Sequence, residues 1–160
     1  MVNLMLFRVV LGLILIFLSF TISRELSKKY RNKRVFFSDF YSFNQQIITE
    51  VSFSNNTLPS ILKTIDDKSD FNSFIKDFFA NGTVDNSLPL YLNEKERKFI
   101  VFYLSNIGKS DSNSQKRYFE DSKNQIVDYL NESKENESKY TPLYLKMGVL
   151  IGFLLFIIVI

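Results

Sequence analysis

The stretch Gly108-Lys109-Ser110 has residue types that could bind a phosphate group. In a phosphate-binding loop, the Lys reaches the phosphates, and a Gly five positions before the second Gly lets backbone N–H groups surround them. Tyr103 occupies that earlier position, and the loop would also need a strand before it. The stretch is therefore interpreted as the end of one helix, followed by a helix N-cap in Ser110-Asp111-Ser112.

Three carboxylates, Asp66, Asp67 and Asp70, could suggest a cation site. They lack the spacing of an EF-hand and its final Glu, so we expect them to be helix-start charges. The chain has no His and no Cys, which removes the commonest general base, the commonest metal ligand and any Ser–His or Cys–His nucleophile. We assign no catalytic, cofactor or metal site and do not expect an enzyme.

A block of basic residues is the other chemically distinct feature, and Glu25 is the only acidic residue within it. Residues 35–142 have the opposite balance, with 12 basic and 16 acidic residues. Basic residues close to a membrane helix stay in the cytoplasm and are attracted to anionic headgroups. We therefore expect contact with membrane lipids, and no nucleic-acid binding by the acidic body. The block consists of Arg24, Lys28, Lys29, Arg31, Lys33 and Arg34.

Two apolar segments lie near the ends of the sequence, and the first of them directly precedes this block. Residues 4–22 and 143–160 each contain one charge, Arg8 or Lys146, and each is close to the roughly 20 residues that a spanning helix needs. The sequence thus predicts a transmembrane helix over 1–23, a soluble cytoplasmic α-helical domain over 24–142 and a second transmembrane helix over 143–160.

An exported protein is the alternative. Residues 9–20 would then be the core of a signal peptide cleaved near 21–23, and Ser138 would accept a lipid anchor. Four glycosylation patterns, which begin at Asn55, Asn81, Asn131 and Asn136, suit such a surface binding protein. The basic block follows the apolar core instead of preceding it, which favours the two-pass interpretation. A membrane sensor is a third class.

Apolar residues at steps of three and four predict helices that build an aromatic core. No run alternates apolar and polar residues as a half-buried strand would, so the fold class is all-α. The first membrane helix is expected to continue through a stripe formed by Phe36, Phe37, Phe40, Tyr41, Phe43, Ile47, Ile48 and Val51.

Four further helices are expected after this stripe. The first covers 58–65, and the second carries Phe71, Phe74, Ile75, Phe78 and Phe79 and ends at Asn81-Gly82. The third opens with a capping box of Asn93 and Glu96, buries Ile100, Tyr103, Leu104 and Ile107, and stops at Gly108. The fourth carries Phe119, Ile126, Tyr129 and Leu130 and leads through Pro142 to the second membrane segment. There, Gly148 and Gly152, with Gly12 in the first segment, predict a close helix crossing.

In their order and spacing, several segments resemble the stage III sporulation protein AB family of endospore-forming bacteria. Glu50-Val51-Ser52-Phe53 and Leu58-Pro59 resemble one family segment and its helix start. The stretch 104–111, with Gly108, Ser110-Asp111 and then Gln115, resembles the most distinctive one. Residues 139–152 resemble the C-terminal part of the family's sequence. The family often has Gly where Asn106 lies and Leu where Met147 lies.

This resemblance implies similarity to the inner-membrane F platform protein of type II secretion: two terminal transmembrane helices that flank a cytoplasmic helical bundle. It implies a non-enzymatic component of the channel complex between mother cell and forespore, in the mother-cell membrane around the forespore. The implied partners are a secretion-type sporulation ATPase, ring-forming proteins and small membrane subunits; the oligomeric state stays open. A structural or partner-contact role is expected for Glu50, Leu58, Pro59, Gly108, Ser110, Asp111 and Gln115.

Overall fold

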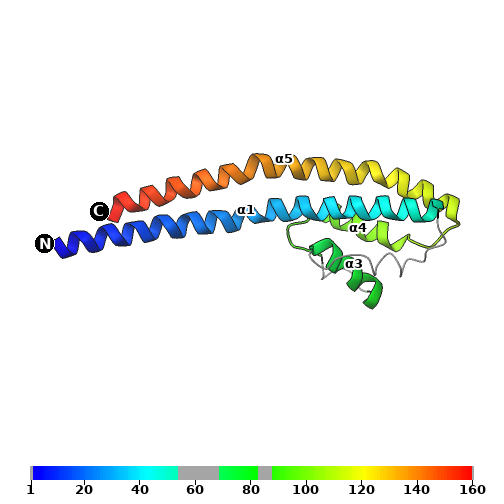
Figure 1. Cartoon of the computed structure of the whole chain (residues 1–160), viewed down its shortest axis with the longest axis horizontal. Helices are drawn as coiled ribbons and strands as arrows, with labels where there is room; N and C mark the ends of the chain where they lie inside the picture. The colour runs from blue at the N-terminus through cyan, green and yellow to red at the C-terminus, as the bar shows by residue number, and fades with distance from the viewer. Residues whose placement is uncertain (1, 54–68, 83–87, 160) are drawn as a thin grey trace. The chain divides into compact units, whose positions relative to one another are not determined.

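The computed structural model describes residues 2–53, 69–82 and 88–159, and within these ranges the chain is helical without a strand (Figure 1). The all-α prediction is confirmed. The predicted helix over 58–65, the motif residues Leu58 and Pro59, and the carboxylates Asp66 and Asp67 lie outside the described residues. The helices are α1 (Val2–Phe53), α3 (Asp70–Asn81), α4 (Glu94–Ser105) and α5 (Ser112–Val159).

The chain forms two compact units, to which α1 and α5 both contribute. The paired-helix unit consists of Met1–Arg31 and Lys134–Ile160, and the bundle unit of Asn32–Ser133. Both α1 and α5 are long and apolar enough to cross a membrane. The predicted domain boundaries after residues 23 and 142 refer to a membrane surface, and they stay predictions.

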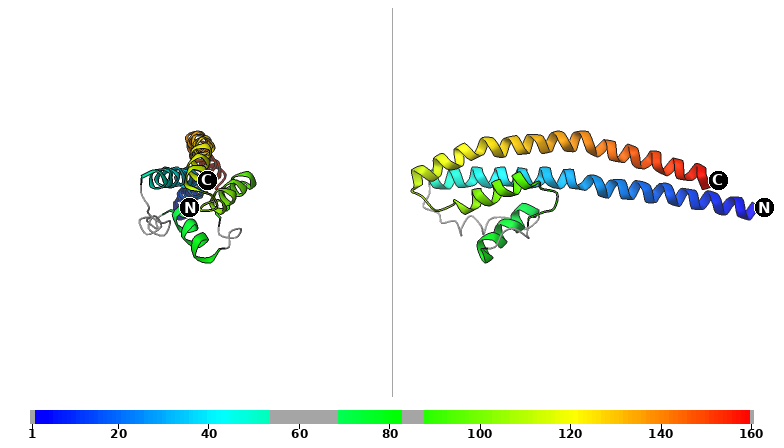
Figure 2. Two further views of the ribbon diagram at one scale, coloured as in Figure 1. Left: turned by 90° about the vertical axis from the view of Figure 1, so that its right-hand side faces the viewer. Right: turned by 180° about the vertical axis from the view of Figure 1, so that it is seen from behind.

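In the bundle unit, α1 and α5 run antiparallel, α4 lies beside α1, and α3 is inclined to the long helices (Figure 2). The α1 stripe faces the core: Phe36, Phe37 and Phe40 are fully buried. The Phe40 ring stacks on Phe71 of α3 at 5.1 Å between centroids and meets Tyr103 of α4 edge-on at 4.9 Å. Such ring pairs stabilise beyond the area that they bury. The stripe is therefore core from Phe36 to Ile48, as expected, and the Val51 side chain lies outside the described part of the structure.

The ends of α3 and α4 follow local capping rules. Ser69 Oγ accepts the Asn72 N–H at the start of α3, and Gly82, with φ 67°, ends it by donating to the Phe78 carbonyl at 3.0 Å. A left-handed φ of this kind favours glycine. At α4, the Asn93 side chain accepts the Glu96 N–H at 2.9 Å, and the Glu96 carboxylate accepts the Asn93 N–H at 2.8 Å. The predicted helix end at Gly82 and the capping box are confirmed.

The prediction that α4 continues to Gly108 is wrong. The helix ends at Ser105, and Asn106 donates its N–H to the Tyr103 carbonyl at 3.3 Å, which tightens the last turn. Ile107 therefore lies beyond the helix, half-buried in the turn that Gly108 completes with φ 78°.

The paired-helix unit has small residues between its helices. Ser19 Oγ of α1 donates to the Gly148 carbonyl of α5 at 2.7 Å. A Cβ at position 152 would lie 3.0 Å from Ile16 Cα, and one at position 148 would overlap Ser23 Oγ. Close approach of backbones at small residues is how helices associate in lipid. The predicted close crossing at Gly148 and Gly152 is confirmed, but Gly12 lies against Phe156 and not opposite these two glycines.

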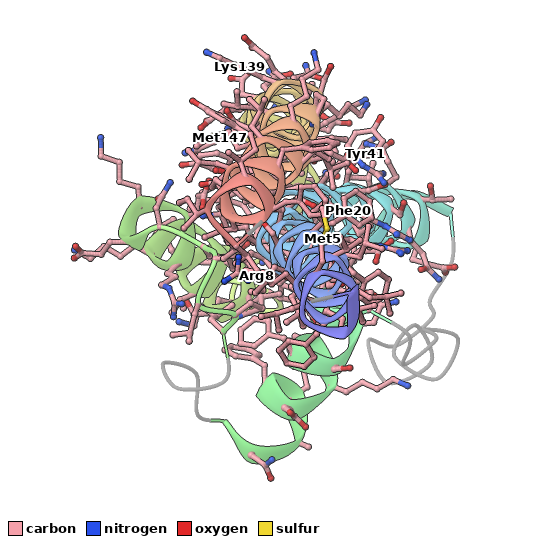
Figure 3. The ribbon with its side chains drawn as sticks, turned by 90° about the vertical axis from the view of Figure 1, so that its left-hand side faces the viewer. Met5, Arg8, Phe20, Tyr41, Lys139 and Met147 are labelled. Atoms are coloured by element: carbon pink, nitrogen blue, oxygen red, sulfur yellow. The ribbon has the colours of Figure 1, made fainter. Side chains whose placement is uncertain are left out.

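Over residues 5–26 of α1 and 143–158 of α5, the outward face of this unit is mainly apolar, and Met5, Phe20 and Met147 of this face are labelled in Figure 3. Its large side chains are exposed, whereas Ser23 and Ser27 are buried against the other helix. A water-soluble bundle has the opposite arrangement, since its large apolar side chains are the buried ones. The exposed side chains are Met5, Leu6, Phe7, Val10, Leu11, Leu13, Ile14, Phe17, Leu18, Phe20, Ile22 and Leu26 on α1, and Leu143, Met147, Val149, Leu150, Ile151, Phe153, Leu154, Ile157 and Ile158 on α5.

Replacing Gly152 with Val should weaken the pairing of the two helices by about 1–3 kcal/mol, because the added methyl groups must displace the backbone at Ile16. Unfolding of the full chain in mixed micelles by increasing SDS measures this free energy. Val149→Ile adds a methyl group on the outward face and should leave the midpoint unchanged. Equal midpoints for both variants would contradict a close crossing at Gly152.

Candidate functional site

The turn between α4 and α5 is organised by one side chain. Gln115 Nε2 donates to the Asn106 carbonyl at 2.8 Å and to Ser110 Oγ at 3.1 Å, while Gln115 Oε1 accepts the Gly108 N–H at 3.2 Å. The Gln115 side chain is 7% exposed, so its amide is largely withdrawn from water. A buried amide with this many partners fixes the backbone around it. Gln115 therefore holds both sides of the turn.

Asp111 starts α5. Its carboxylate accepts the Ser114 N–H at 3.1 Å, and its carbonyl accepts the Gln115 N–H at 2.9 Å. Hydrogen bonds from the Ser114 hydroxyl and N–H lower the pKa of Asp111, because they favour the ionised form. The predicted N-cap is confirmed. The hydrogen bonds of Gln115 and Asp111 are thus made to other groups of the same turn.

The structure thus brings together four of the seven predicted family-motif residues: Gly108, Ser110, Asp111 and Gln115. Glu50 lies on α1, half-buried, and takes no part in these hydrogen bonds. Leu58 and Pro59 are outside the described residues. The hydrogen bonds of the four grouped residues lie in the turn that joins α4 to α5. A partner contact by any of the seven stays a prediction.

Replacing Gln115 with Leu should lower the free energy of unfolding by about 1–3 kcal/mol. The apolar side chain leaves the Gly108 N–H and the Asn106 carbonyl of this partly buried turn without their partner. Urea unfolding of the full chain in detergent, followed by circular dichroism, measures the loss. Gln125→Leu, on the exposed face of α5, is the matched control and should change stability by less than about 0.5 kcal/mol. Equal losses would show that Gln115 does not organise the turn.

The basic block is divided between the two units. Lys33 belongs to the bundle unit, where its Nζ lies 2.6 Å from Glu96 Oε1. Their side chains are 14% and 0% exposed, so this ion pair is buried and ties α1 to the first turn of α4. Glu96 Oε2 also accepts the Asn93 N–H in the capping box. The sequence pattern predicted the cap and gave no sign of the ion pair.

The other cations of the block have different surroundings. Arg24 and Arg31 are exposed, Lys28 pairs with Glu25 at 2.6 Å, and Arg34 is half-buried in the bundle unit. Lys29 Nζ lies 5.0 Å from the Tyr30 ring centroid, within cation–π range. The predicted lipid contacts of the block therefore concern mainly the cations of the paired-helix unit.

Tyrosines surround Lys29 in the paired-helix unit. Tyr30 stacks on Tyr140 at 5.0 Å between centroids and lies 5.8 Å from Tyr144, over which Lys29 also sits at 5.7 Å. Burial, followed by a hydrogen bond with Tyr144, raises the pKa of Tyr30 to about 12. Tyrosines and cations next to an apolar helix segment are typical of a membrane–water interface. Tyr30, Tyr140 and Tyr144, called the tyrosine cluster below, join α1 to α5 next to the apolar part of both helices.

A buried polar network joins three helices of the bundle unit. Tyr103 Oη of α4 donates to Asn44 Oδ1 of α1 at 2.7 Å, and Asn44 Nδ2 donates to the Phe119 carbonyl of α5 at 3.3 Å. Burial raises the pKa of Tyr103 well above its usual value, so its hydroxyl stays protonated. Both side chains are inaccessible to solvent, and the network is therefore part of the core. Sequence reasoning missed Asn44, because a single Asn on a helix has no spacing signal.

None of the residues that the structure describes form a group of three or more potential metal ligands. Comparison with known proteins adds one finding: the family described as stage III sporulation protein AB matches residues 75–160. This range is more than half of the chain, and it includes the Gln115 turn and the glycines at 148 and 152, but not Glu50, Leu58 or Pro59. No curated protein and no solved structure matches the chain.

Proposed function

Because the chain belongs to the stage III sporulation protein AB family and is thus related to sporulation, we propose that it is a non-enzymatic membrane component of a sporulation channel complex. It sits in the mother-cell membrane around the forespore, and its bundle unit faces the cytoplasm. There it acts as a platform that contacts a secretion-type ATPase, alongside ring-forming and small membrane subunits.

The observation that carries this proposal is the distribution of side chains in the paired-helix unit, which has small residues between its helices and large apolar residues on the outside. Ser19, Gly148 and Gly152 are turned inward, while large apolar side chains face outward. In water, this much exposed apolar surface would be costly, at about 25 cal/mol per Å². In a bilayer, the same surface meets acyl chains, and small residues are what helix pairing requires. The construction supports insertion of both helices.

The distribution of charge supports the orientation. Exposed Arg24 and Arg31, with Lys28 and Lys29, follow the apolar part of α1 directly, and such residues are retained on the cytoplasmic side. The tyrosine cluster lies at the same level of α1. Both features support an interface of the cytoplasmic leaflet close to residues 24–31.

The bundle unit supports a structural role. Its buried polar groups are engaged in holding helices together: Lys33 with Glu96, Asn44 with Tyr103, and Gln115 with its turn. Groups committed in this way are poorly placed to transfer protons or bind a substrate. The unit offers partners a helical surface with a small acidic excess, 14 acidic against 12 basic residues over 32–133, and an ATPase would dock on such a surface through complementary charge.

The topology is tested with a single engineered cysteine, because the chain has none. Asn124, exposed on α5 in the bundle unit, is replaced with Cys. A maleimide that cannot cross membranes should label this variant only after the cells are permeabilised, and the Cys-free chain should stay unlabelled throughout. Labelling in intact cells would place the bundle outside and overturn the proposal.

The platform role is tested by cross-linking in sporulating cells, followed by purification of the full chain. The secretion-type ATPase should co-purify. The association should survive exchange of residues 1–23 and 143–160 for unrelated membrane helices, since the bundle unit makes the contact. Absence of the ATPase from cross-linked material, with the chain correctly inserted, would overturn the platform role.

A further inference from the structure

A groove of about 460 Å³ opens on the surface of the paired-helix unit, between its two helices. Its volume is within the range of sites that hold small ligands. Phe20 of α1 lines one side, and the other lining residues come from two successive turns of α5. In Figure 3, Phe20 lies on the side of the pair away from Met147, so the groove occupies one side only. The residues of α5 are Leu145, Lys146, Val149 and Leu150.

Lys146 is the single charged residue in this lining. It lies on α5 between Tyr144 of the tyrosine cluster and Gly148, which is bonded to Ser19. Because the two helices are antiparallel, Lys146 is at the end of the groove nearer to the tyrosine cluster. Leu150 is one turn deeper on the same face of α5. The groove therefore has an ammonium at its interfacial end and an apolar floor below.

A second cation has a corresponding place on α1. Arg24 is one turn from Phe20, on the same face and toward the tyrosine cluster, and it is exposed. Lys146 is also exposed, and among the residues that the structure describes no carboxylate forms an ion pair with it. An ammonium at membrane depth is costly unless it reaches the interface or an anion.

From these placements we propose that the groove binds one anionic phospholipid, with its phosphate at Lys146 and Arg24 and an acyl chain along Phe20, Val149 and Leu150. The charge of the lipid satisfies both cations, and its chain fills the apolar floor. This site rests on insertion of the two helices and is independent of the platform role. It adds a specific lipid to the general attraction that the basic block exerts on headgroups.

The site is tested on the full chain in detergent, to which phosphatidylglycerol or phosphatidylcholine is added, with bound lipid counted by native mass spectrometry. Lys146→Gln should lower the apparent affinity for phosphatidylglycerol about fivefold, and Lys146→Gln with Arg24→Gln by about twentyfold. Val149→Trp fills the groove without changing its charge and should abolish the retention of lipid. Lys134→Gln removes an exposed cation from the same unit, away from the groove, and should have no effect.

Equal losses for Lys146→Gln and Lys134→Gln would overturn the site, because they would show a general charge effect. Equal retention of phosphatidylglycerol and phosphatidylcholine by the unchanged chain would show that the site does not prefer an anionic lipid, and would overturn the proposal. Membrane insertion is tested separately, by incorporation of the chain into phospholipid nanodiscs followed by size-exclusion chromatography. A chain that fails to incorporate overturns the membrane proposal together with the site, whereas an inserted chain without lipid preference overturns only the site.

Discussion

Replacing Lys33 with Met should lower the free energy of unfolding of the bundle unit by about 3–5 kcal/mol. Glu96 has no solvent-exposed surface, and its Oε1 relies on the Lys33 ammonium 2.6 Å away. Without that ammonium, the carboxylate must stay buried without a counter-charge or leave the capping box that begins α4. Either outcome weakens the contact between α4 and α1. Urea unfolding of the full chain in detergent, monitored by circular dichroism, measures the change.

The same helix offers a matched control. Glu94 and Lys98 form an ion pair at 2.5 Å, but their side chains are 79% and 75% exposed. Lys98→Met should therefore leave the unfolding midpoint unchanged, because exposed pairs are screened by water and contribute little. Combining Lys33→Met with Glu96→Gln should recover most of the lost stability, since no buried charge then remains. If Lys33→Met and Lys98→Met unfold at the same urea concentration, the Lys33–Glu96 pair is not a stabilising contact.

The Phe40→Ala variant should lose about 3–5 kcal/mol of unfolding free energy, the range for removing a buried Phe. Phe40 is fully buried, and its ring contacts Phe71 of α3 and both Phe99 and Tyr103 of α4. One side chain thus joins three helices, and the cavity left by its removal cannot be filled by a single neighbour. Near-ultraviolet circular dichroism of the tyrosines reports the loss of packing, and urea unfolding gives its size.

Phe102→Ala is the control for this prediction. Phe102 is on α4 as well, but it is 61% exposed and contacts only the edge of the core through Tyr118 at 6.4 Å. Truncation there should cost less than about 1 kcal/mol. A Phe40 variant as stable as the Phe102 variant would mean that the aromatic stripe of α1 is not the centre of the core.

The helices and the core were predictable because their signals are local. The steps of three and four from Phe36 to Ile47 identify the buried face of α1, since side chains at that spacing share one side of a helix. Gly82 and the Asn93–Glu96 box mark helix ends through bonds that reach only three or four residues. Gly148 and Gly152, four residues apart on one face of α5, identified the α5 side of the helix crossing, but not the residues of α1 that face it.

The pairings that connect helices were not predictable. Lys33 was interpreted only as a cation beside the membrane, yet its partner is on α4. Asn44 and Tyr103 likewise meet across two helices. Such contacts depend on how far each helix is rotated toward its neighbour, which residue spacing does not record. The end of α4 at Ser105 was missed because a tightened last turn leaves the same apolar pattern as a regular one.

The distinctive segment 104–115 was predictable as important, but its role was not. Its Gly, Ser-Asp and Gln are the types expected in a binding loop or in a helix connection. The hydrogen bonds of Gln115 to both sides of the turn support the second interpretation. A side chain whose hydrogen bonds reach back five, seven and nine residues leaves no periodic pattern by which the sequence could reveal it.

The bond from Ser19 to Gly148 has a consequence for divergence among homologous chains. Its acceptor is a main-chain oxygen, which every residue possesses, so position 148 is constrained by volume and not by polarity. The surrounding outward-facing positions need only remain apolar. Sequences in this part of the protein can therefore drift far apart while the structure is retained, and distant members should be recognised by the placement of their smallest residues.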